Sequence, residues 1–540
     1  MSAADRRLLA REATLSAALA GTLAAALLWA MPPGIDWAAH AYQRTFLLQH
    51  GFAIWNNFWY AGRYSFVTYS LIYYPLAALL GIKVLALASI TAAAAGFTFV
   101  VFGQWGPVSR LSSRTFAVIW AGIVASAAFP FALAVSFALL SIWEFQRGRR
   151  GVFALGAVLT FAASPLAFAL LCVVLGGAAI SRRGGWRRQV LPAAVVVACG
   201  VAELILVRLF GDGGRFPFGT LQLLPALVFC GLGLLVTRDV PAARPLFGMF
   251  LLYLAVVLLA YFVPSSLGSN IERIRYAALP LALMAVALRN WRPLWLVVPA
   301  VALAAVWNLT PIASSLAQTN SSAETSAAYW QPAIWFLHGH LSPSYRVEVV
   351  DTADHWPAAY LPDAGIPIVR GWYRQNDFPQ NELLYDARLN AAPYEAWLRR
   401  LAVRYVVLTD APTDYSSRYE ARLIRSGRTS LVPVFRARHL TVYELPDPRP
   451  IMTGPGGASV LWLYPSRLVA VVEQAATYRV RVRWSPYLHT SQGCVGRAPD
   501  GMVSLTTAHP GLVELHVALD VHGSLQAIAG GSGPRCASRT

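Results

Sequence analysis

The sequence predicts a polytopic α-helical membrane domain followed by an extracytoplasmic α/β domain and a C-terminal β-sandwich. Of its 540 residues, 56% are hydrophobic and only 13% are charged, and the mean hydropathy is +0.50. A water-soluble globular fold does not fit this composition. The apolar residues form segments of about membrane-crossing length up to residue 312, and shorter alternating patterns follow.

We expect about eleven membrane-spanning helices in residues 1–312. The first covers residues 14–30, behind Arg6, Arg7 and Arg11, and is interpreted as an uncleaved anchor because no convincing cleavage site precedes Pro32. The apolar stretch 152–180 is divided into two short helices at Ser164–Pro165; if it is instead a single span, the topology of all later segments is inverted. The remaining spans are expected near residues 84–104, 115–130, 131–145, 152–164, 165–180, 189–209, 219–236, 245–263, 276–288 and 294–312.

Basic residues indicate the topology of these spans. The formal net charge is +18, but the positive residues lie in short runs between apolar segments, which argues against nucleic-acid binding. Lys and Arg collect in cytoplasmic loops, so the N-terminus is expected inside, with the outer loop 32–82, the loop 211–218 and everything after about residue 313 outside. The expected cytoplasmic loops are Arg110–Arg114, Arg147–Arg150, Arg182–Arg188, Arg238–Arg244 and Arg289–Arg292.

The outer half divides into a linker and two domains. A linker rich in Ser, Ala and Thr is expected over 313–329, an α/β domain over 330–448 and the β-sandwich over 455–540. The α/β domain is expected to have strands at Arg346–Asp351 and Arg404–Thr409 and helices at Tyr394–Leu401 and Ser417–Ser426, and the sandwich strands at Val460–Val472 and Tyr478–Trp484.

Two further features of the outer half leave alternatives open. The stretches His355–Pro362 and Val369–Asn381 mix Trp, Tyr, Arg, Asn and Asp, so they either contact sugar or pack the domain against the membrane half. Cys494 and Cys536 lie in the expected sandwich and form a disulfide if that domain is extracytoplasmic; otherwise they are free thiols.

The stretch Asp36–Pro75 carries the strongest functional signal. It follows the first span and combines Asp36 and His40 with many Trp and Tyr residues, a mixture that suits a sugar or a lipid headgroup at the membrane edge. Arg273 and Arg275 stand where a later span enters from outside; at a spacing of two they do not share a helix face, so at most one faces a cavity. Guanidinium groups there, or that of Arg208 near a span end, suit phosphate oxygens, but anchoring at the headgroup level is the alternative.

These features resemble the GT-C superfamily of polytopic glycosyltransferases, and more closely the bacterial YfhO-like and 6-pyruvoyl-tetrahydropterin synthase-related membrane proteins. Most of the chain is covered by the resemblance. The residues that carry it are Asp36, His40, Trp55, Trp59, Gly62, Tyr73-Tyr74-Pro75, Asn270–Arg275 and the strand RYVVLT at 404–409.

The resemblance implies a transferase of the bacterial plasma membrane that moves a sugar from a polyprenyl-phosphate-sugar donor to an extracytoplasmic glycan or lipid acceptor. Asp36 takes the position of the catalytic base or of a ligand to a divalent cation, Mg²⁺ or Mn²⁺, and His40 would orient it or share the proton. Many members have two adjacent acids where this sequence has Asp36-Trp37. Residues 51–74 would form interfacial helices beside which the lipid carrier lies. The residues that would bind the substrate are Arg208, Arg273, Arg275, Trp55, Trp59, Tyr73 and Tyr74.

Two other functions compete with this one. A transporter or flippase of a lipid-linked glycan would use similar spans and intramembrane charges, but the odd span count, the lack of a visible inverted repeat and the large outer region argue against it. A non-catalytic membrane protein that binds cell-envelope glycan through its outer domains is the other alternative, with Asp36 in a structural role.

Overall fold

The structure is a computed structural model that describes residues 3–181, 189–319, 323–531 and 533–536. The chain divides into two compact units. The first comprises Met1–Trp37, Tyr69–Leu204 and Arg215–Asn320, and the second comprises Ala38–Thr68, Ile205–Gly214 and Ser321–Thr540. The expected membrane domain 1–312 is therefore interrupted twice, because most of the outer loop 32–82 and the end of one span belong to the second unit.

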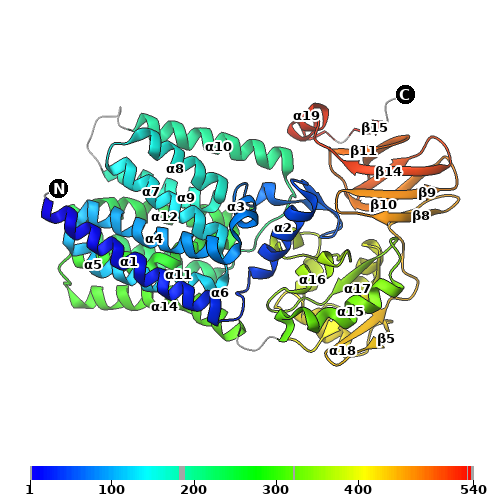
Figure 1. The fold of residues 1–540 in the computed structure, drawn as a ribbon, viewed down its shortest axis with the longest axis horizontal. Coiled ribbons are helices and arrows are strands. Elements are labelled where there is room, and N and C mark those ends of the chain that lie inside the picture. Colours follow the sequence, from blue (N-terminus) through cyan, green and yellow to red (C-terminus); the bar gives the residue numbers. More distant parts are fainter. Residues whose placement is uncertain (1–2, 182–188, 320–322, 532, 537–540) are drawn as a thin grey trace. The chain divides into compact units, whose positions relative to one another are not determined.

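The first unit is a bundle of apolar helices (Figure 1). Its buried residues include a cluster of Leu, Val, Ala and aromatic side chains from residues 173–307. The helices are α1 (Ala3–Ala30), α3 (Tyr73–Leu80), α4 (Ile82–Trp105), α5 (Arg110–Trp120), α6 (Ile123–Ser126), α7 (Phe129–Gln146), α8 (Arg150–Ala163), α9 (Pro165–Ser181), α10 (Val190–Phe210), α11 (Thr220–Thr237), α12 (Arg244–Phe262), α13 (Ala278–Leu288) and α14 (Leu294–Thr319), with 3₁₀ turns η2 (Gly106–Ser109), η4 (Pro241–Ala243) and η5 (Gly268–Ala277).

Seven helical stretches in the described part of the chain are long and apolar enough to cross a membrane. They are Ala3–Ala30, Ile82–Ser126, Phe129–Gln146, Val190–Phe210, Thr220–Thr237, Pro241–Phe262 and Leu294–Ala317. The expected count of about eleven is not confirmed. The difference lies in 152–164, 165–180 and 276–288, which are helices of 14, 17 and 11 residues, and in 115–130, which continues the helical stretch that begins at Ile82.

Two breaks in these helices show how local sequence ends them. The expected break at Ser164–Pro165 is present, and Ser164 is extended with φ −162° and ψ 113° because a residue before proline is disfavoured in helical geometry. The helix expected over 115–130 is interrupted: α5 ends at Trp120, and α6 ends at Ser126, directly before Ala127, which is left-handed with φ 53°. The expected cytoplasmic loop Arg182–Arg188 lies outside the described residues.

The outer segment in the second unit begins with α2 (Trp37–His50), in which all residues but Trp37 belong to this unit. After it come the short antiparallel strands β1 (Trp55–Asn56) and β2 (Arg63–Tyr64) and the turn η1 (Phe66–Thr68). The expected interfacial helices over 51–74 are therefore wrong for this segment. Apart from Phe52, which is 67% exposed, the aromatic side chains of residues 51–68 are buried. The segment is tied to the α/β domain, since Trp59 Nε1 donates to Ala358 O (2.9 Å) and Ile368 N donates to Phe58 O (3.0 Å).

The α/β domain is built on a four-stranded sheet with the strand order β3-β4-β6-β5. The β3 and β4 strands are parallel, and the other pairs are antiparallel. The expected linker 313–329 is largely helical, since α14 runs to Thr319 and α15 starts at Ala327; residues 320–322 lie outside the described part. The elements are η6 (Ala323–Thr325), α15 (Ala327–His340), β3 (Arg346–Val349), α16 (Pro357–Asp363), η7 (Arg374–Asp377), η8 (Glu382–Tyr385), α17 (Ala391–Arg400), β4 (Val403–Thr409), α18 (Arg418–Arg425), β5 (Val432–Arg436) and β6 (Leu440–Glu444).

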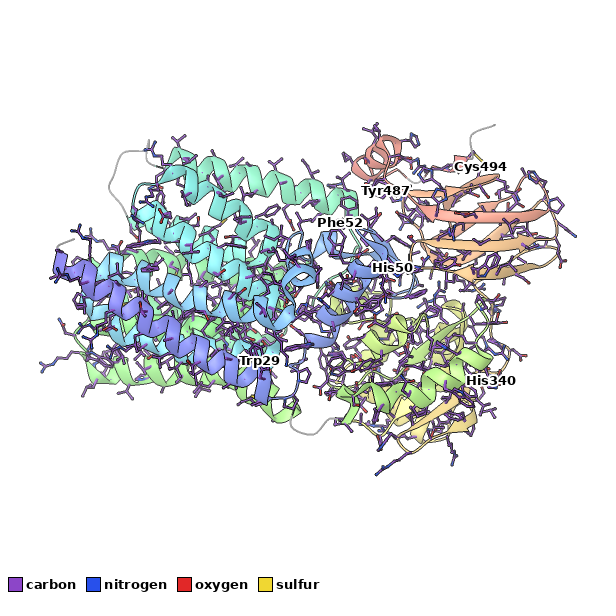
Figure 2. All side chains as sticks on the ribbon, viewed as in Figure 1. Trp29, His50, Phe52, His340, Tyr487 and Cys494 are labelled. Carbon is purple, nitrogen blue, oxygen red and sulfur yellow. A yellow bond between two sulfur atoms is a disulfide. The ribbon has the colours of Figure 1, made fainter. Side chains whose placement is uncertain are left out.

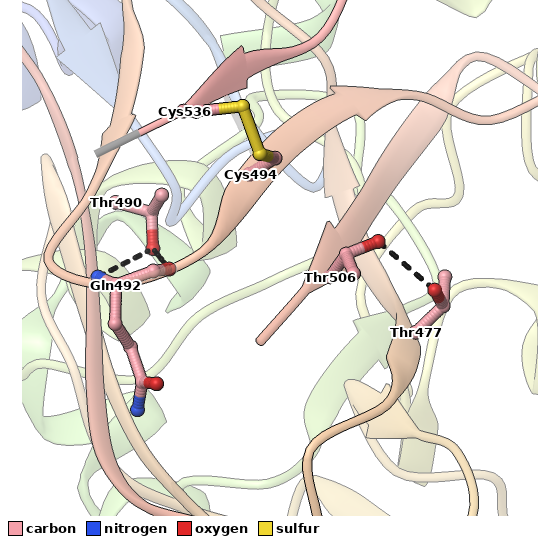
Figure 3. The surroundings of a disulfide bond; sticks show 6 residues. All are labelled: Thr477, Thr490, Gln492, Cys494, Thr506 and Cys536. Atoms are coloured by element: carbon pink, nitrogen blue, oxygen red, sulfur yellow. Dashed lines mark hydrogen bonds between the residues drawn. A yellow bond between two sulfur atoms is a disulfide. The ribbon is translucent and has the colours of Figure 1, made fainter. Parts of the chain in front are cut away.

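The C-terminal domain consists of two sheets that share one core of Val, Leu and Tyr side chains (Figure 1). Their strand orders are β15-β12-β13-β10-β7 and β11-β14-β9-β8. Cys494 and Cys536 are directly paired between β12 and β15 and form a disulfide (Figure 3). The elements are β7 (Met452–Thr453), β8 (Ala458–Leu463), β9 (Arg467–Val472), β10 (Thr477–Arg483), β11 (Leu488–Thr490), β12 (Cys494–Arg497), β13 (Met502–Thr506), β14 (Gly511–Val517), α19 (Val521–Ala529) and β15 (Arg535–Cys536).

Candidate functional site

The main chain fixes Asp36 at the start of α2. Asp36 N donates to Ser126 O (3.1 Å), and Trp37 N donates to Gly34 O (2.9 Å). Gly34 makes this close approach possible, because a Cβ atom there would lie 2.5 Å from Val124 O and 2.6 Å from Ala125 O. Asp36 directly precedes the helix, and this N-cap position favours aspartate.

Arg273 is the basic residue that the structure brings to Asp36. Its Nη2 lies 4.0 Å from Asp36 Oδ2, and the two side chains are 18% and 16% exposed. The guanidinium also lies 5.5 Å from the centre of the Phe131 ring and hydrogen-bonds to Tyr69. Burial alone would lower the pKa of Arg273, but Tyr69 and Asp36 hold it above its ordinary value, so the site contains a fixed positive charge.

The turn η5 separates the two arginines of the loop. Arg275 Nη1 lies 3.9 Å from Glu272 Oε2, three residues earlier, while Arg273 lies near Asp36. The two guanidiniums thus lie beside different acids, and whether one of them faces a cavity stays a prediction. Tyr276 OH donates to Ser126 Oγ (3.0 Å), which ties the end of η5 to the backbone segment that holds Asp36.

Glu272 provides a test of this loop by pH. It is 4% exposed, and burial raises its pKa to about 7, with Arg275 opposing the rise. Because the raised pKa favours the protonated form in the folded state, stability is expected to fall as the pH rises from about 4.5 through about 7. Glu272→Gln should therefore raise the free energy of unfolding at pH 8 by up to about 3 kcal/mol, and by little at pH 5. The change in stability is measured by melting temperatures in detergent at pH 5 and pH 8. Glu473→Gln, at an exposed glutamate, is the control. An equal effect of Glu272→Gln at both pH values contradicts the prediction.

The site does not fit a divalent cation. Asp36 is a single carboxylate, and a metal ion beside it would lie next to the guanidinium of Arg273. Among the described residues, no group of three or more His, Cys, Asp or Glu side chains could hold a metal ion. We therefore assign no role to Mg²⁺ or Mn²⁺ in the chemistry of this site.

His40 lies in the second unit and is fully buried. Its ring is 6.2 Å from that of Trp372, in a tilted arrangement. His40 lies in the first turn of the α2 helix, four residues after Asp36. Its role as a helper of Asp36 stays a prediction.

The four aromatic residues expected to bind substrate are core residues. Trp55 and Trp59 are 2% and 0% exposed, and Tyr73 and Tyr74 are 0% and 1% exposed. Trp55 Nε1 donates to Asn57 Oδ1 (2.8 Å), so its polar atom is already used inside the protein. All four side chains are buried in this structure, so their assignment to substrate binding stays a prediction.

Arg208 lies on the exposed side of the last turns of α10. In the apolar stretch of this helix, only 11% of the residues are buried inside the protein. This position is typical of an arginine that extends along a span toward the headgroups, which was the alternative to phosphate binding.

A second group of charged residues lies inside the α/β domain. It includes polar side chains of the stretch Val369–Asn381, for which contact with sugar was one of the two alternatives. Arg370 is 5% exposed; its Nη2 donates to Asp377 Oδ2 (2.9 Å) and to Ser416 Oγ (2.9 Å). Asp377 also accepts from Asn381 Nδ2 (2.9 Å) and Tyr385 OH (2.7 Å). These groups satisfy one another within the domain, so we interpret the stretch Val369–Asn381 as a structural core.

His355 belongs to a neighbouring cluster in the same domain. Its Nδ1 lies 2.8 Å from Asp351 Oδ2, and Arg374 Nη2 lies 3.1 Å from its Nε2. A guanidinium only donates, so Nε2 accepts and the ring proton is on Nδ1, facing Asp351. Arg374 in turn contacts Asp414 (2.7 Å) and stacks on Tyr415 at 4.4 Å from the ring centre.

Sequence reasoning did not find the surroundings of the Asp36–Arg273 pair. Tyr69, Ser126 and Phe131 were not expected at this site, and only Tyr69 lay in the stretch that drew attention. Comparison with known protein families and with curated proteins finds no match for this chain. The function is therefore argued from the residues and the geometry.

Proposed function

We propose that this chain is a membrane glycosyltransferase of the GT-C type that moves a sugar from a polyprenyl-phosphate-sugar donor to an extracytoplasmic acceptor. The single observation that carries the proposal is the Asp36–Arg273 pair. A carboxylate and a guanidinium, both mostly buried, lie 4.0 Å apart beside a helix start, in a chain with seven apolar stretches of membrane-crossing length among its described residues.

The chemistry of such a transfer matches the two groups. The acceptor hydroxyl oxygen attacks C1 of the sugar as the bond from C1 to the carrier phosphate oxygen breaks, and the electron pair leaves with the phosphate. Asp36 takes the hydroxyl proton, and Arg273 stabilises the negative charge on the departing carrier phosphate. A guanidinium at the edge of ion-pair distance from Asp36 keeps donors available for phosphate oxygens.

The resemblance described above supports the same class, including a catalytic acid directly after the first span. Two large outer domains also suit an acceptor on the outer side, in keeping with the expected topology, in which the basic loops are cytoplasmic. The expectation of about eleven membrane-spanning helices, four more than the seven long apolar stretches of the described residues, is part of this proposal.

A second candidate function, binding of cell-envelope glycan without catalysis, is favoured by the outer face of one sandwich sheet. Trp462 is 51% exposed and pairs with Val469, which pairs with Glu514 in the next strand, so the three share one face. Arg467 lies 3.9 Å from Glu514 and stacks on Tyr464 at 4.9 Å from its ring centre. An exposed indole on the same sheet face as a carboxylate and a guanidinium offers an apolar platform and hydrogen-bonding groups for a sugar.

One experiment distinguishes the two functions. The purified full chain is incubated with a panel of polyprenyl phosphate sugars and envelope glycan acceptors, and the release of free carrier phosphate is measured together with glycan binding. We expect carrier phosphate release with at least one donor, and equal release by Trp462→Ala. Glycan binding that Trp462→Ala abolishes, without release from any donor, contradicts the transferase and supports the second function.

A further inference from the structure

The last helix of the chain presents an apolar face that nothing in the described structure covers. Val521, Leu525 and Ile528 of α19 are 77%, 61% and 51% exposed, and Leu519 just before the helix is 55% exposed. The spacing of 521, 525 and 528 puts these side chains on one side of the helix. Gly523 and Ala527 lie on the other side, toward the sandwich core.

This helix is a fixed part of the domain. The Asp520 side chain caps its N-terminus by accepting from Gly523 N, and Arg535 donates to the same carboxylate. Arg535 precedes Cys536, which is joined to Cys494 in β12. A Cβ at position 523 would meet Pro486 O at 2.7 Å, so glycine lets the helix lie directly on the chain before β11. The exposed face is therefore held in place by a cap, an ion pair and a disulfide.

The side of α19 that faces the sandwich packs on Tyr487, and Tyr487 contacts the last residue of α10, a helix of membrane-crossing length. A Cβ at Gly523 would also lie 2.8 Å from the Tyr487 ring, and this ring lies 5.6 Å from that of Phe210 (Tyr487 is labelled in Figure 2). Phe210 is the last residue of α10, and Leu206 and Leu209 pack in the same cluster as Ala527. These residues all belong to the second unit, so the contact is internal to it.

The α10 helix is the part of this cluster that meets lipid. It is long and apolar enough to cross a membrane, and in the part of it that belongs to the second unit Ile205 and Val207 are 47% and 54% exposed. An exposed helix this apolar is surrounded by acyl chains, and its end marks the level at which the bilayer gives way to headgroups. Within the second unit, this helix end contacts Tyr487, on which α19 also packs, so the headgroup level that the helix end marks lies next to α19.

We propose that α19 is an interfacial helix that docks on the bilayer surface, with Leu519, Val521, Leu525 and Ile528 at the boundary between headgroups and acyl chains. Residues 519–530 contain no Lys or Arg, so the attraction comes from apolar burial and not from anionic lipid. The proposal is independent of the transferase function, since it concerns only how the sandwich is held at the membrane.

The test places a spin label on the full chain in nanodiscs of zwitterionic lipid. Cys172, Cys199 and Cys230 are replaced by Ser, the Cys494–Cys536 disulfide is kept, and Leu525→Cys is labelled. Leu512→Cys is the matched control, because Leu512 is exposed to a similar extent, 58%, at the start of β14. Accessibility to oxygen, which concentrates in lipid, is compared with accessibility to a water-soluble nickel complex.

We expect the label at 525 to be at least fivefold more accessible to oxygen than to the nickel complex, relative to the label at 512, with no change when anionic lipid is added. Ile528→Cys provides a second position with the same expected result. Equal ratios at 525 and 512 overturn the proposal. Spin–spin broadening at 525 also overturns it, because the apolar face would then cover a second copy of the chain.

Discussion

Asp36→Asn is expected to reduce the release of carrier phosphate by roughly 10²–10⁴-fold, the usual contribution of a general base. Asparagine is chosen because it caps helices about as well as aspartate, so the start of α2 should be kept while the proton acceptor is lost. The variant thus separates the proposed catalytic role from the structural one. The measurement is the rate of carrier phosphate release with the donor found active for the unaltered chain, together with the melting temperature.

The control for this experiment is Asp239→Asn. Asp239 is 63% exposed and pairs with Arg238 in the first unit, so its substitution should leave the rate unchanged. Arg273→Gln should lower the rate with Asp36 intact, because the departing phosphate would lose its cation. A chain with Asp36→Asn that releases carrier phosphate at the original rate would leave Asp36 as a helix cap and ion-pair partner only.

Local sequence predicted most of the secondary structure of this protein but not how its segments are grouped. Apolar length marked the helices, Pro165 marked a break, and the short run of apolar and β-branched residues in 404–409 marked β4. The assignment of residues 38–68 to the second unit depends on contacts such as that between Trp59 and Ala358, which are far apart in the sequence. No local pattern encodes such a pairing.

The candidate site was predictable in part for the same reason. The types and positions of Asp36 and Arg273 drew attention to them, but their meeting depends on how η5 and the Ser126 segment pack. The exposure of the aromatic residues could not be predicted, because composition does not tell an exposed ring from a buried one: Trp59 and Tyr73 are 0% exposed, whereas Trp462 is 51% exposed. Neighbours across the fold decide that difference.

Arg370→Met is expected to lower the free energy of unfolding of the α/β domain by about 3–5 kcal/mol, the usual cost of removing one partner of a buried ion pair. Asp377 is 1% exposed and Glu420 is 0% exposed, and both would remain in the core without this guanidinium. Burial, with Glu420 nearby, already raises the pKa of Glu348, and Arg370 opposes that rise. Losing Arg370 therefore leaves a group of acids that must bind protons or reach water.

The matched control for this prediction is Arg388→Met. Arg388 is 92% exposed and lies 3.5 Å from Asp386, which is 49% exposed, so its loss should cause no measurable change. Replacing Arg370 and Asp377 together by Met and Leu should recover part of the stability, since no single buried charge then remains from the pair. Urea unfolding followed by proteolysis of the outer domain measures all three variants. If Arg370→Met is no less stable than Arg388→Met, the hydrogen bonds of Arg370 do not stabilise the stretch Val369–Asn381. Its polar side chains then become candidates for sugar binding again.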